Sequence, residues 1–301
     1  MNKKQFVTSI TGILEERMEE GVQVKLQEVR KNNNIVLQGL LIQKPESNIS
    51  PTIYLDSFYE KYEAGSDLEE IVDAILEIYE RGAVKSNLDM EFFRDFEQVK
   101  ERIVYRLIHA EKNKELLEDI PHILYLDLAI CFYYAFHDEE LGEGMILVHN
   151  THMEMWNTNH QELMKQAQEN TPKLFQPIFV TLDAIMNNIC GMDESVKEEL
   201  KEDDYMYVLT NRQKNQGAAC ILYPDMLEQT AQKLKGNFYV IPSSIHEVII
   251  LRDTGCEDLS VLQEIIKEAN KSQVLVEDVL SDHPYYYDKE EKKLVSRKIV
   301  Y

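Results

Sequence analysis

The chain has 301 residues, 44% of them hydrophobic, and its 54 acidic residues against 32 basic ones give a formal net charge of −22. A negative field of this size repels nucleic-acid phosphates and anionic lipid head groups, and the short basic runs of the sequence do not offset it. No stretch approaches the roughly 18 apolar residues that a membrane span needs, so we expect neither nucleic acid nor membrane as a partner.

The N-terminal part predicts a hairpin flanked by helices. Apolar residues recur at helical spacing over 4–20, where acidic residues interrupt any signal-peptide pattern, and Gly21 is a natural stop. Alternating residues over 22–43, with three asparagines at the turn, predict two paired strands. A short third strand over 52–55 and an amphipathic helix over 68–78 follow.

The middle of the chain combines helical spacing of apolar residues with continuous apolar runs that are typical of strands. Phenylalanine and aliphatic residues at helical spacing predict a helix over 90–109. The apolar run 124–136 predicts a long strand that returns over 145–148 after a polar loop, although periodicity alone leaves a buried helix open for this run. Thr151 or Asn159 is a candidate cap for helices ending at residue 170, and a further helix is predicted over 178–190.

Residues 205–252 predict a compact ββαββ unit. Two strand candidates, 205–211 and 217–224, are followed by a short helix and by two more strands over 237–252. A helix over 259–269 and a terminal pair of strands complete the chain.

Strand pairs joined by short polar turns, without regular βαβ alternation, predict an α+β fold. We expect a mainly antiparallel sheet of hairpins with helices inserted between the strand pairs. The acidic stretch 194–204 is the best linker candidate. It divides the chain into two tightly packed lobes, 1–195 and 196–301, and the sequence leaves open whether they form one domain.

The PSSIHEV segment holds the main candidates for catalysis: Ser243, Ser244, His246 and Glu247. A nucleophile and a base this close in sequence suggest a hydrolase. However, no GxSxG elbow surrounds either serine, and a strand over 245–251 would point the imidazole of His246 and the carboxylate of Glu247 to opposite faces. The simpler interpretation is a turn followed by a surface strand.

Metal and cofactor sites have weaker signals. His149 and His152 are spaced for one helix face, but neither an HExxH motif nor a cysteine partner accompanies them. The four cysteines stand singly, and no CxxC spacing occurs, so neither zinc nor a disulfide framework is predicted. Phosphate-binding glycine loops are absent from the sequence. We expect no cofactor and a cytoplasmic location.

Several motifs resemble one protein family in the same order along nearly the whole chain. They include TIYLDSFYEKYEAG, LYLDLAICFYY, GAACILYP, IPSSIHEVIIL and LSDHPYYYD. The family is an uncharacterised bacterial one, catalogued only as a domain of unknown function (5688). The resemblance implies a cytoplasmic bacterial protein and transfers no catalytic residues.

Two hypotheses for the function follow. The favoured one is a non-enzymatic interaction or accessory protein whose acidic surface suits a basic protein partner. The alternative is a hydrolase or a small-molecule-binding enzyme centred on the PSSIHE segment. The oligomeric state is left open.

Overall fold

The fold was obtained as a computed structural model, and its contacts divide the chain into two compact units. One unit comprises residues 1–92 and 137–142, and the other comprises residues 93–136 and 143–301. The structure describes residues 1–45, 50–82, 91–138, 142–184 and 205–296. Antiparallel sheets combined with separate helices confirm the predicted α+β class.

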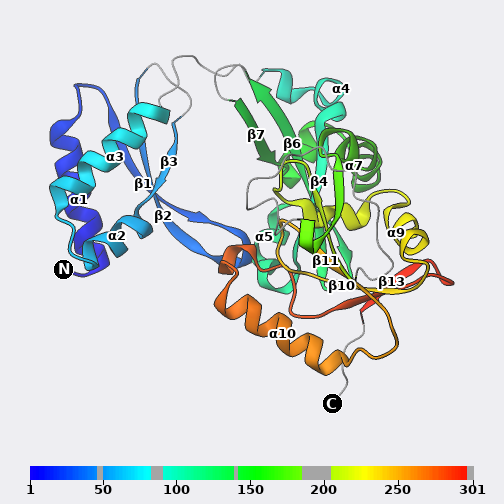
Figure 1. Ribbon diagram of the computed structural model, residues 1–301. Coiled ribbons are helices and arrows are strands. Elements are labelled where there is room, and N and C mark those ends of the chain that lie inside the picture. Colours follow the sequence, from blue (N-terminus) through cyan, green and yellow to red (C-terminus); the bar gives the residue numbers. More distant parts are fainter. Residues whose placement is uncertain (46–49, 83–90, 139–141, 185–204, 297–301) are drawn as a thin grey trace. The chain divides into compact units, whose positions relative to one another are not determined.

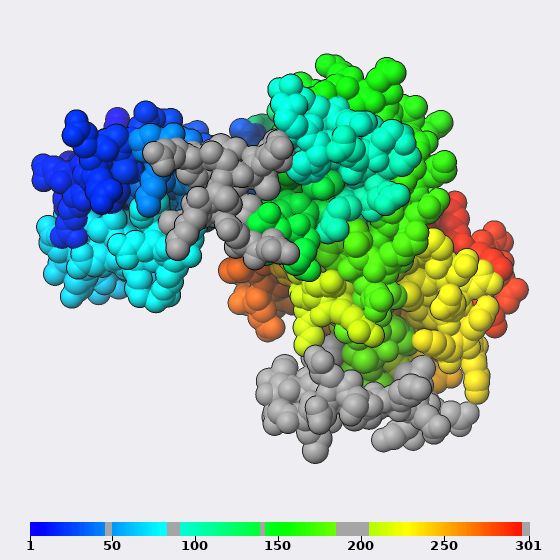
Figure 2. Space-filling model, turned by 90° about the horizontal axis from the view of Figure 1, so that it is seen from above, coloured from blue at the N-terminus to red at the C-terminus, as the bar shows by residue number. Residues whose placement is uncertain are grey.

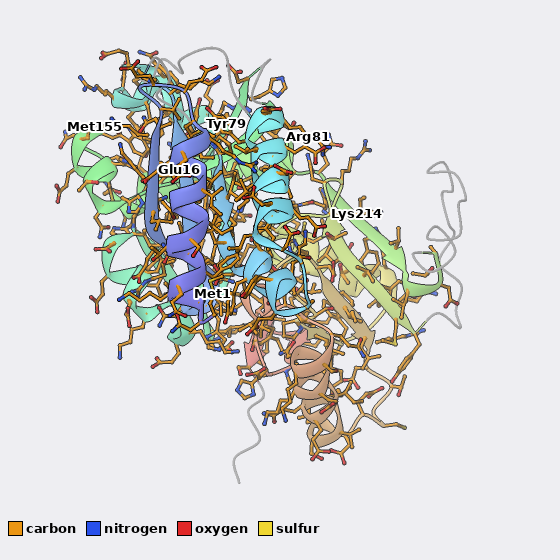
Figure 3. All side chains as sticks on the ribbon, turned by 90° about the vertical axis from the view of Figure 1, so that its left-hand side faces the viewer. Met1, Glu16, Tyr79, Arg81, Met155 and Lys214 are labelled. Carbon is orange, nitrogen blue, oxygen red and sulfur yellow. The ribbon has the colours of Figure 1, made fainter. Side chains whose placement is uncertain are left out.

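The first unit is a small antiparallel sheet with helices packed on one face (Figure 1). Its strands are β1 (Gln23–Arg30), β2 (Val36–Gln43) and β3 (Thr52–Tyr54), and its helices are α1 (Lys3–Arg17), α2 (Leu55–Glu63) and α3 (Leu68–Gly82). Buried Leu40 and Ile42 of β2 share a core with Phe6 and Ile10 of α1 and Ile75 of α3. Figure 3 looks onto the helical layer, where α1 and α3 lie side by side.

The predicted first hairpin is confirmed. Leu26 lies opposite Leu40 in the antiparallel ladder of β1 and β2. The turn η1 (Asn32–Asn34) contains Asn33 and Asn34 with φ of 58° and 60°. Asparagine tolerates this left-handed conformation better than most residues, so the turn residues and the alternating strands agree.

In the described residues, the main sheet of the second unit has the strand order β13-β12-β10-β11-β9-β8. Its strands are β8 (Pro177–Thr181), β9 (Met206–Asn211), β10 (Phe238–Ile241), β11 (Val248–Arg252), β12 (Tyr285–Asp288) and β13 (Lys293–Ser296). They are joined by η5 (Gly217–Leu222), α9 (Met226–Leu234), α10 (Leu259–Ser272) and η6 (Val276–Asp278). Helix α10 packs through Leu259 and Leu262 onto Tyr239, Leu251 and Tyr286 of this sheet.

A second sheet of the same unit is built on the long strand β6. It contains β4 (Ile103–His109), β5 (His122–Tyr125), β6 (Leu128–Asp138) and β7 (Gly142–Leu147), and β4 pairs with β6 in antiparallel register. The connecting helices are α5 (Lys114–Asp119), α6 (Asn150–Met155) and α7 (His160–Leu174), with a short η4 (Glu111–Asn113). Figure 2 shows that the cyan, green and yellow segments of this unit pack against one another although they lie far apart in sequence.

Helix α7 is held to strand β4 by polar side chains. Thr171 Oγ1 accepts a hydrogen bond from Tyr105 N at 3.1 Å, and Asn170 Nδ2 donates to Ile103 O at 3.0 Å. Of the two predicted caps, Asn159 caps α7 by accepting from Gln161 N at 3.0 Å, whereas Thr151 lies inside α6. None of the helices in the described residues has the length and the apolar content that a bilayer crossing requires.

The helix predicted over 90–109 is wrong. This region contains η2 (Glu91–Arg94), α4 (Phe96–Val99) and η3 (Lys100–Arg102), and then the strand β4. In β4 every residue from Ile103 to Ile108 except Arg106 is buried. A strand that is buried on both faces is apolar throughout, and such a run also satisfies a helical spacing.

The predicted strand over 217–224 is also wrong, because η5 occupies it. The sulfur of Cys220 donates to Thr210 O at 3.2 Å, so the segment folds back onto β9 rather than pairing with it as a strand. The helix predicted over 178–190 begins instead as strand β8, which pairs with β9, and residues 185–190 lie outside the described part of the chain. The acidic stretch 194–204, and with it the lobe boundary predicted near residue 195, also lies outside the described residues and stays a prediction.

Candidate functional site

The serines of the PSSIHEV segment bond to the glutamate that follows them. Glu247 Oε1 accepts hydrogen bonds from Ser244 Oγ at 3.2 Å and from Ser243 Oγ at 3.5 Å. The strand predicted over 245–251 begins only at Val248, so the carboxylate of Glu247 belongs to the loop and folds back over both hydroxyls. Ser244 is only 6% exposed. These three side chains therefore converge, but in a turn that satisfies its own hydrogen bonds.

The imidazole of His246 is directed away from the serines. Its Nε2 lies 3.3 Å from Asp278 Oδ1, and its Nδ1 accepts a hydrogen bond from Gln216 N at 3.3 Å. The backbone N–H of His246, and not its ring, donates to Ser244 Oγ at 3.0 Å. Because both ring nitrogens have other partners, neither is placed to accept a serine proton, as the hydrolase hypothesis requires.

Backbone contacts explain why the segment takes this shape. Thr210 Oγ1 donates to His246 O at 2.7 Å, Ala218 N donates to Ile245 O at 3.2 Å, and Ile245 N donates to Asp278 O at 2.8 Å. A Cβ atom on Gly217 would lie 2.5 Å from His246 O, so only glycine allows η5 to approach this closely. The motif joins strand β9 to η5 and η6, which is a structural role.

The two histidines proposed as metal ligands lie at the start of α6. His149 N donates to Nδ1 of His152 at 3.1 Å, so this ring nitrogen caps the helix. The ring of His152 packs with its centroid 5.1 Å from that of Phe93 and 5.8 Å from that of Trp156. Burial, and then the neighbouring His149, lower the pKa of His152. Within the described residues, no group of three histidine, cysteine or acidic side chains could hold a metal ion.

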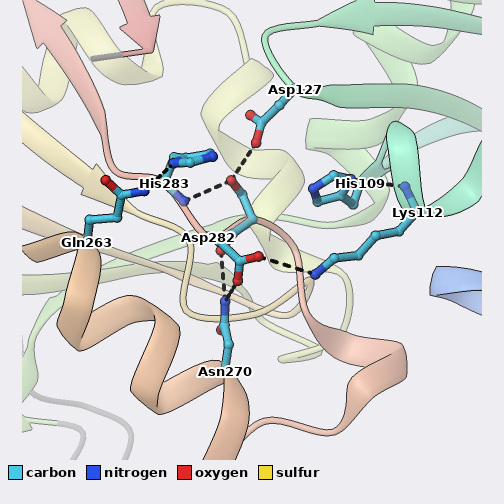
Figure 4. A network of polar contacts seen from close by, with 8 residues as sticks. His109, Lys112, Asp127, Gln263, Asn270, Asp282 and His283 are labelled. Atoms are coloured by element: carbon cyan, nitrogen blue, oxygen red, sulfur yellow. Dashed lines mark hydrogen bonds and ion pairs between the residues drawn. The ribbon is translucent and has the colours of Figure 1, made fainter. Parts of the chain in front are cut away.

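A polar network centres on Asp127, in the turn between β5 and β6 (Figure 4). Asp127 Oδ2 accepts a hydrogen bond from Ser281 Oγ at 2.6 Å, and its Oδ1 accepts one from the hydroxyl of Tyr285 at 2.7 Å. Both donors are fully buried. Ser281 Oγ also accepts from His283 N at 3.1 Å. The carboxylate thus ties the β5–β6 turn to the segment that leads into β12.

The second arm of the network surrounds Asp282. Its carboxylate accepts from Asn270 Nδ2 at 2.7 Å and lies 3.6 Å from Lys112 Nζ. Burial alone would raise the pKa of Asp282, but the bond from Asn270 and the charge of Lys112 outweigh it, so this pKa falls below its usual value. The side chain of His283 does not pair with Asp282, since its Nδ1 lies 2.9 Å from Gln263 Nε2.

His109 lies beside this network but bonds locally. Its Nδ1 accepts from Lys112 N at 3.3 Å, and burial, followed by the charge of Lys112, lowers the pKa of its ring. The imidazole is therefore neutral at neutral pH. Ser281 donates to a carboxylate and accepts from a backbone amide, so its hydroxyl is not paired with a base that could activate it. We therefore assign the network a structural role: it links segments of the second unit that are far apart in sequence.

A cavity of about 460 Å³ lies elsewhere in the second unit. Two arginines, Arg102 and Arg106, line it together with the rings of Phe136 and Phe175. The side chain of Arg106 leaves β4 into this cavity, and its guanidinium carbon lies 4.7 Å from the centre of the Tyr133 ring. None of the residues proposed from the sequence as catalytic or metal-binding lines this cavity.

Sequence reasoning missed both Asp127 and Arg106. A signal existed for Arg106, which is the one charged residue inside the otherwise apolar run 103–108. For Asp127 no local spacing indicated a role, because its partners Ser281 and Tyr285 are more than 150 residues away in sequence. Both stretches that supply the network, LYLD and LSDHPYYYD, carried the family resemblance.

The comparisons with known proteins support that resemblance. Neither the curated proteins nor the solved structures contain a match to this chain. The model of a family of unknown function, DUF5688, matches residues 3–289, which is nearly the full length. The match transfers no residue role. The chain therefore belongs to the DUF5688 family, whose function is unknown.

Proposed function

We propose that this protein is a non-enzymatic interaction protein of the bacterial cytoplasm and that it binds a basic protein partner. The observation that carries the proposal is an exposed apolar stripe on the outer face of helix α10, flanked by acidic residues. The free thiols of Cys131, Cys220 and Cys256 are in keeping with a reducing compartment.

Helix α10 has an apolar residue pair on each side. Its inner face buries Ile266 and packs Leu262 onto the main sheet. On its outer face, Val261 and Ile265 are 50% and 59% exposed and lie one turn apart. Figure 1 shows α10 beside the main sheet, where it packs on the strands β10, β11 and β12. Exposed apolar side chains grouped on one helix face are typical of protein-binding surfaces.

The acidic residues beside this apolar pair favour a basic partner. Glu264 and Glu268 are exposed one turn apart beside the apolar pair Val261 and Ile265, and Lys267 and Lys271 are exposed farther from the pair. The net charge of −22 adds a long-range attraction for cations. A basic amphipathic segment would place apolar residues on the pair and its lysines or arginines against the glutamates. We therefore expect a partner that contributes such a segment.

A pull-down with matched variants tests the proposal. Full-length protein is the bait in bacterial lysate, and retained proteins are identified after washes at low and then at high salt. The double variant Val261→Asp/Ile265→Asp adds charge to the apolar pair, and Glu264→Lys/Glu268→Lys reverses the flanking charge. Leu124→Asp serves as the control, because Leu124 is an apolar residue that is 67% exposed but belongs to β5 and not to α10.

We expect a basic protein that the wild type and the Leu124 control retain, that high salt releases, and that both α10 variants lose. Affinity of the purified partner would then fall by about tenfold or more, because charged pairs and apolar anchors at an interface contribute on the order of 1–2 kcal/mol each. Retention of the same proteins by all four baits, or a retained partner that is acidic and insensitive to salt, would contradict the proposal.

A further inference from the structure

The cavity of about 460 Å³ lies wholly within the second unit and combines cationic with apolar walls. Arg102 and Arg106 contribute the cations, and Phe136, Met145 and Phe175 contribute apolar surface. Its volume is within the range of about 300–1,000 Å³ that small-molecule sites occupy. Charged and amide side chains, among them Glu143 and Gln213, share the lining with these apolar groups.

Arg106 is a half-buried cation with weak partners. Its guanidinium lies over the ring of Tyr133, and one of its terminal nitrogens contacts the sulfur of Met145. Its Nε is buried and has no hydrogen-bond partner. Burial lowers the pKa of Arg106, and the contribution of Tyr133 opposes this shift only in part. A cation removed from water is costly unless an anion or several good acceptors replace the lost hydration.

The second arginine is equally without a counter-charge. Arg102 Nε donates to the backbone oxygen of Ala135, and the side chain lines the cavity. Glu143 also lines the cavity, yet in the described part of the chain no carboxylate forms an ion pair with either arginine. By contrast, Arg17 of the first unit binds both Glu69 and Asp73.

Arginines without a carboxylate partner are unexpected in this chain, because it has 54 acidic residues against 32 basic ones. In so acidic a protein, two arginines on one cavity that pair with no carboxylate of the described residues suit an anionic ligand. The guanidinium fork matches the two oxygens of a carboxylate or a phosphate in a bidentate pair. The rings of Phe136 and Phe175 would accept an apolar group attached to that anion.

We propose that this cavity is a binding site for a small organic anion, with its carboxylate or phosphate on Arg102 and Arg106 and its apolar part between Phe136 and Phe175. The shape of the wall depends on Gly144, because a Cβ atom there would lie 2.2 Å from Cζ of Phe136. Gln213, held by Leu174 O at 3.1 Å, places an amide on the rim. The site is independent of the outer face of α10.

Binding is measured by calorimetry and by thermal unfolding of the full chain at constant ionic strength. The probes are phenyl phosphate and benzoate, which carry an anion and a ring, inorganic phosphate, which carries no ring, and benzyl alcohol, which carries no charge. We expect the two ring-bearing anions to bind, and to raise the unfolding midpoint, more strongly than inorganic phosphate, and benzyl alcohol to have no effect. Which of the two anions binds more tightly distinguishes a phosphate ligand from a carboxylate ligand.

Variants then locate the site. Arg106→Met keeps the length of the side chain and removes its charge, and we expect affinity for the better anion to fall by roughly 30-fold or more. Arg102→Gln should also weaken binding, and Gly144→Ala should reduce the advantage of the ring-bearing anions by displacing Phe136. Lys165→Met, which removes an exposed positive charge from α7, is the control and should bind as the wild type does.

The unliganded variants provide a second readout. If the charge of Arg106 serves a ligand, Arg106→Met without ligand should unfold at or above the midpoint of the wild type, since a partly desolvated charge without an ion-pair partner is gone. A lower midpoint together with unchanged binding would overturn the proposal and assign Arg106 a structural role. Absence of binding by every anion in the wild-type protein, or equal binding by the Arg106→Met and Lys165→Met variants, would overturn it as well.

Discussion

One carboxylate, that of Asp127, is the acceptor for two fully buried hydroxyls. Burial raises the pKa of the Tyr285 hydroxyl well above its ordinary value, and the charge of Asp127 raises it further, so this group is always a donor. A buried donor without an acceptor loses the hydration it had in the unfolded chain and gains nothing in return. The network is therefore more important for stability than its polar composition suggests.

Asp127→Ala should lower the free energy of unfolding by about 1–3 kcal/mol for each hydroxyl that is left without an acceptor. Urea denaturation followed by circular dichroism measures the change, and Tyr285→Phe, which removes one of the two donors, should cost less than Asp127→Ala. Glu169→Ala, at an exposed position of α7, is the control and should leave the midpoint nearly unchanged. Equal midpoints for Asp127→Ala and the control would refute the assigned role.

At the scale of the secondary-structure elements, local sequence patterns predicted the structure correctly where the turn residues and the strand alternation agreed. The hairpin of β1 and β2 is such a case, because Asn33 and Asn34 adopt the positive φ that its turn requires. The helix predicted over 90–109 failed because β4 is buried on both faces, which removes the alternation that marks a strand. For η5, the deciding contacts with Thr210 and His246 come from other segments, and no local propensity contains them.

The close approach of η5 to β9 makes Gly217 sensitive to substitution. In Gly217→Ala the new Cβ would lie 2.2 Å from Thr210 Oγ1 and 2.5 Å from His246 O, so η5 must move away from the sheet. We expect a loss of about 1–3 kcal/mol, as in other overpacked sites. Thermal unfolding measures it.

Gly12 provides the matched control for that substitution. It lies inside helix α1, and a Cβ atom there would meet nothing within 4 Å. Gly12→Ala should therefore raise stability by about 0.5–1 kcal/mol, the gain expected in a helix interior. If both substitutions change the midpoint in the same direction, the packing constraint at Gly217 is not the cause.

At the scale of the whole molecule, the α+β class followed from the pattern of elements, whereas the candidate sites did not. Ser281 reaches Asp127 across 154 residues, and the arginine cavity combines side chains from β4, the end of β6, the start of β7 and the end of α7. Such contacts between distant residues depend on tertiary packing, which cannot be read from the spacing of residues along the chain. By contrast, the excess of acidic residues could be counted from the sequence and acts on the entire fold.

That excess predicts how stability depends on salt. A net charge of −22 repels itself more in the compact chain than in the unfolded one, and added salt screens this repulsion. Raising sodium chloride from about 0.01 to 0.15 M shortens the screening length from about 30 to 8 Å. We expect the free energy of unfolding to rise by on the order of 1 kcal/mol, and the midpoint by about 2–4 °C. Thermal unfolding across a chloride series measures this rise, and Arg106→Met should show it too, because screening does not depend on the cavity. A midpoint that falls with salt would mean that attractive ion pairs, such as those of Arg17 with Glu69 and Asp73, outweigh the repulsion.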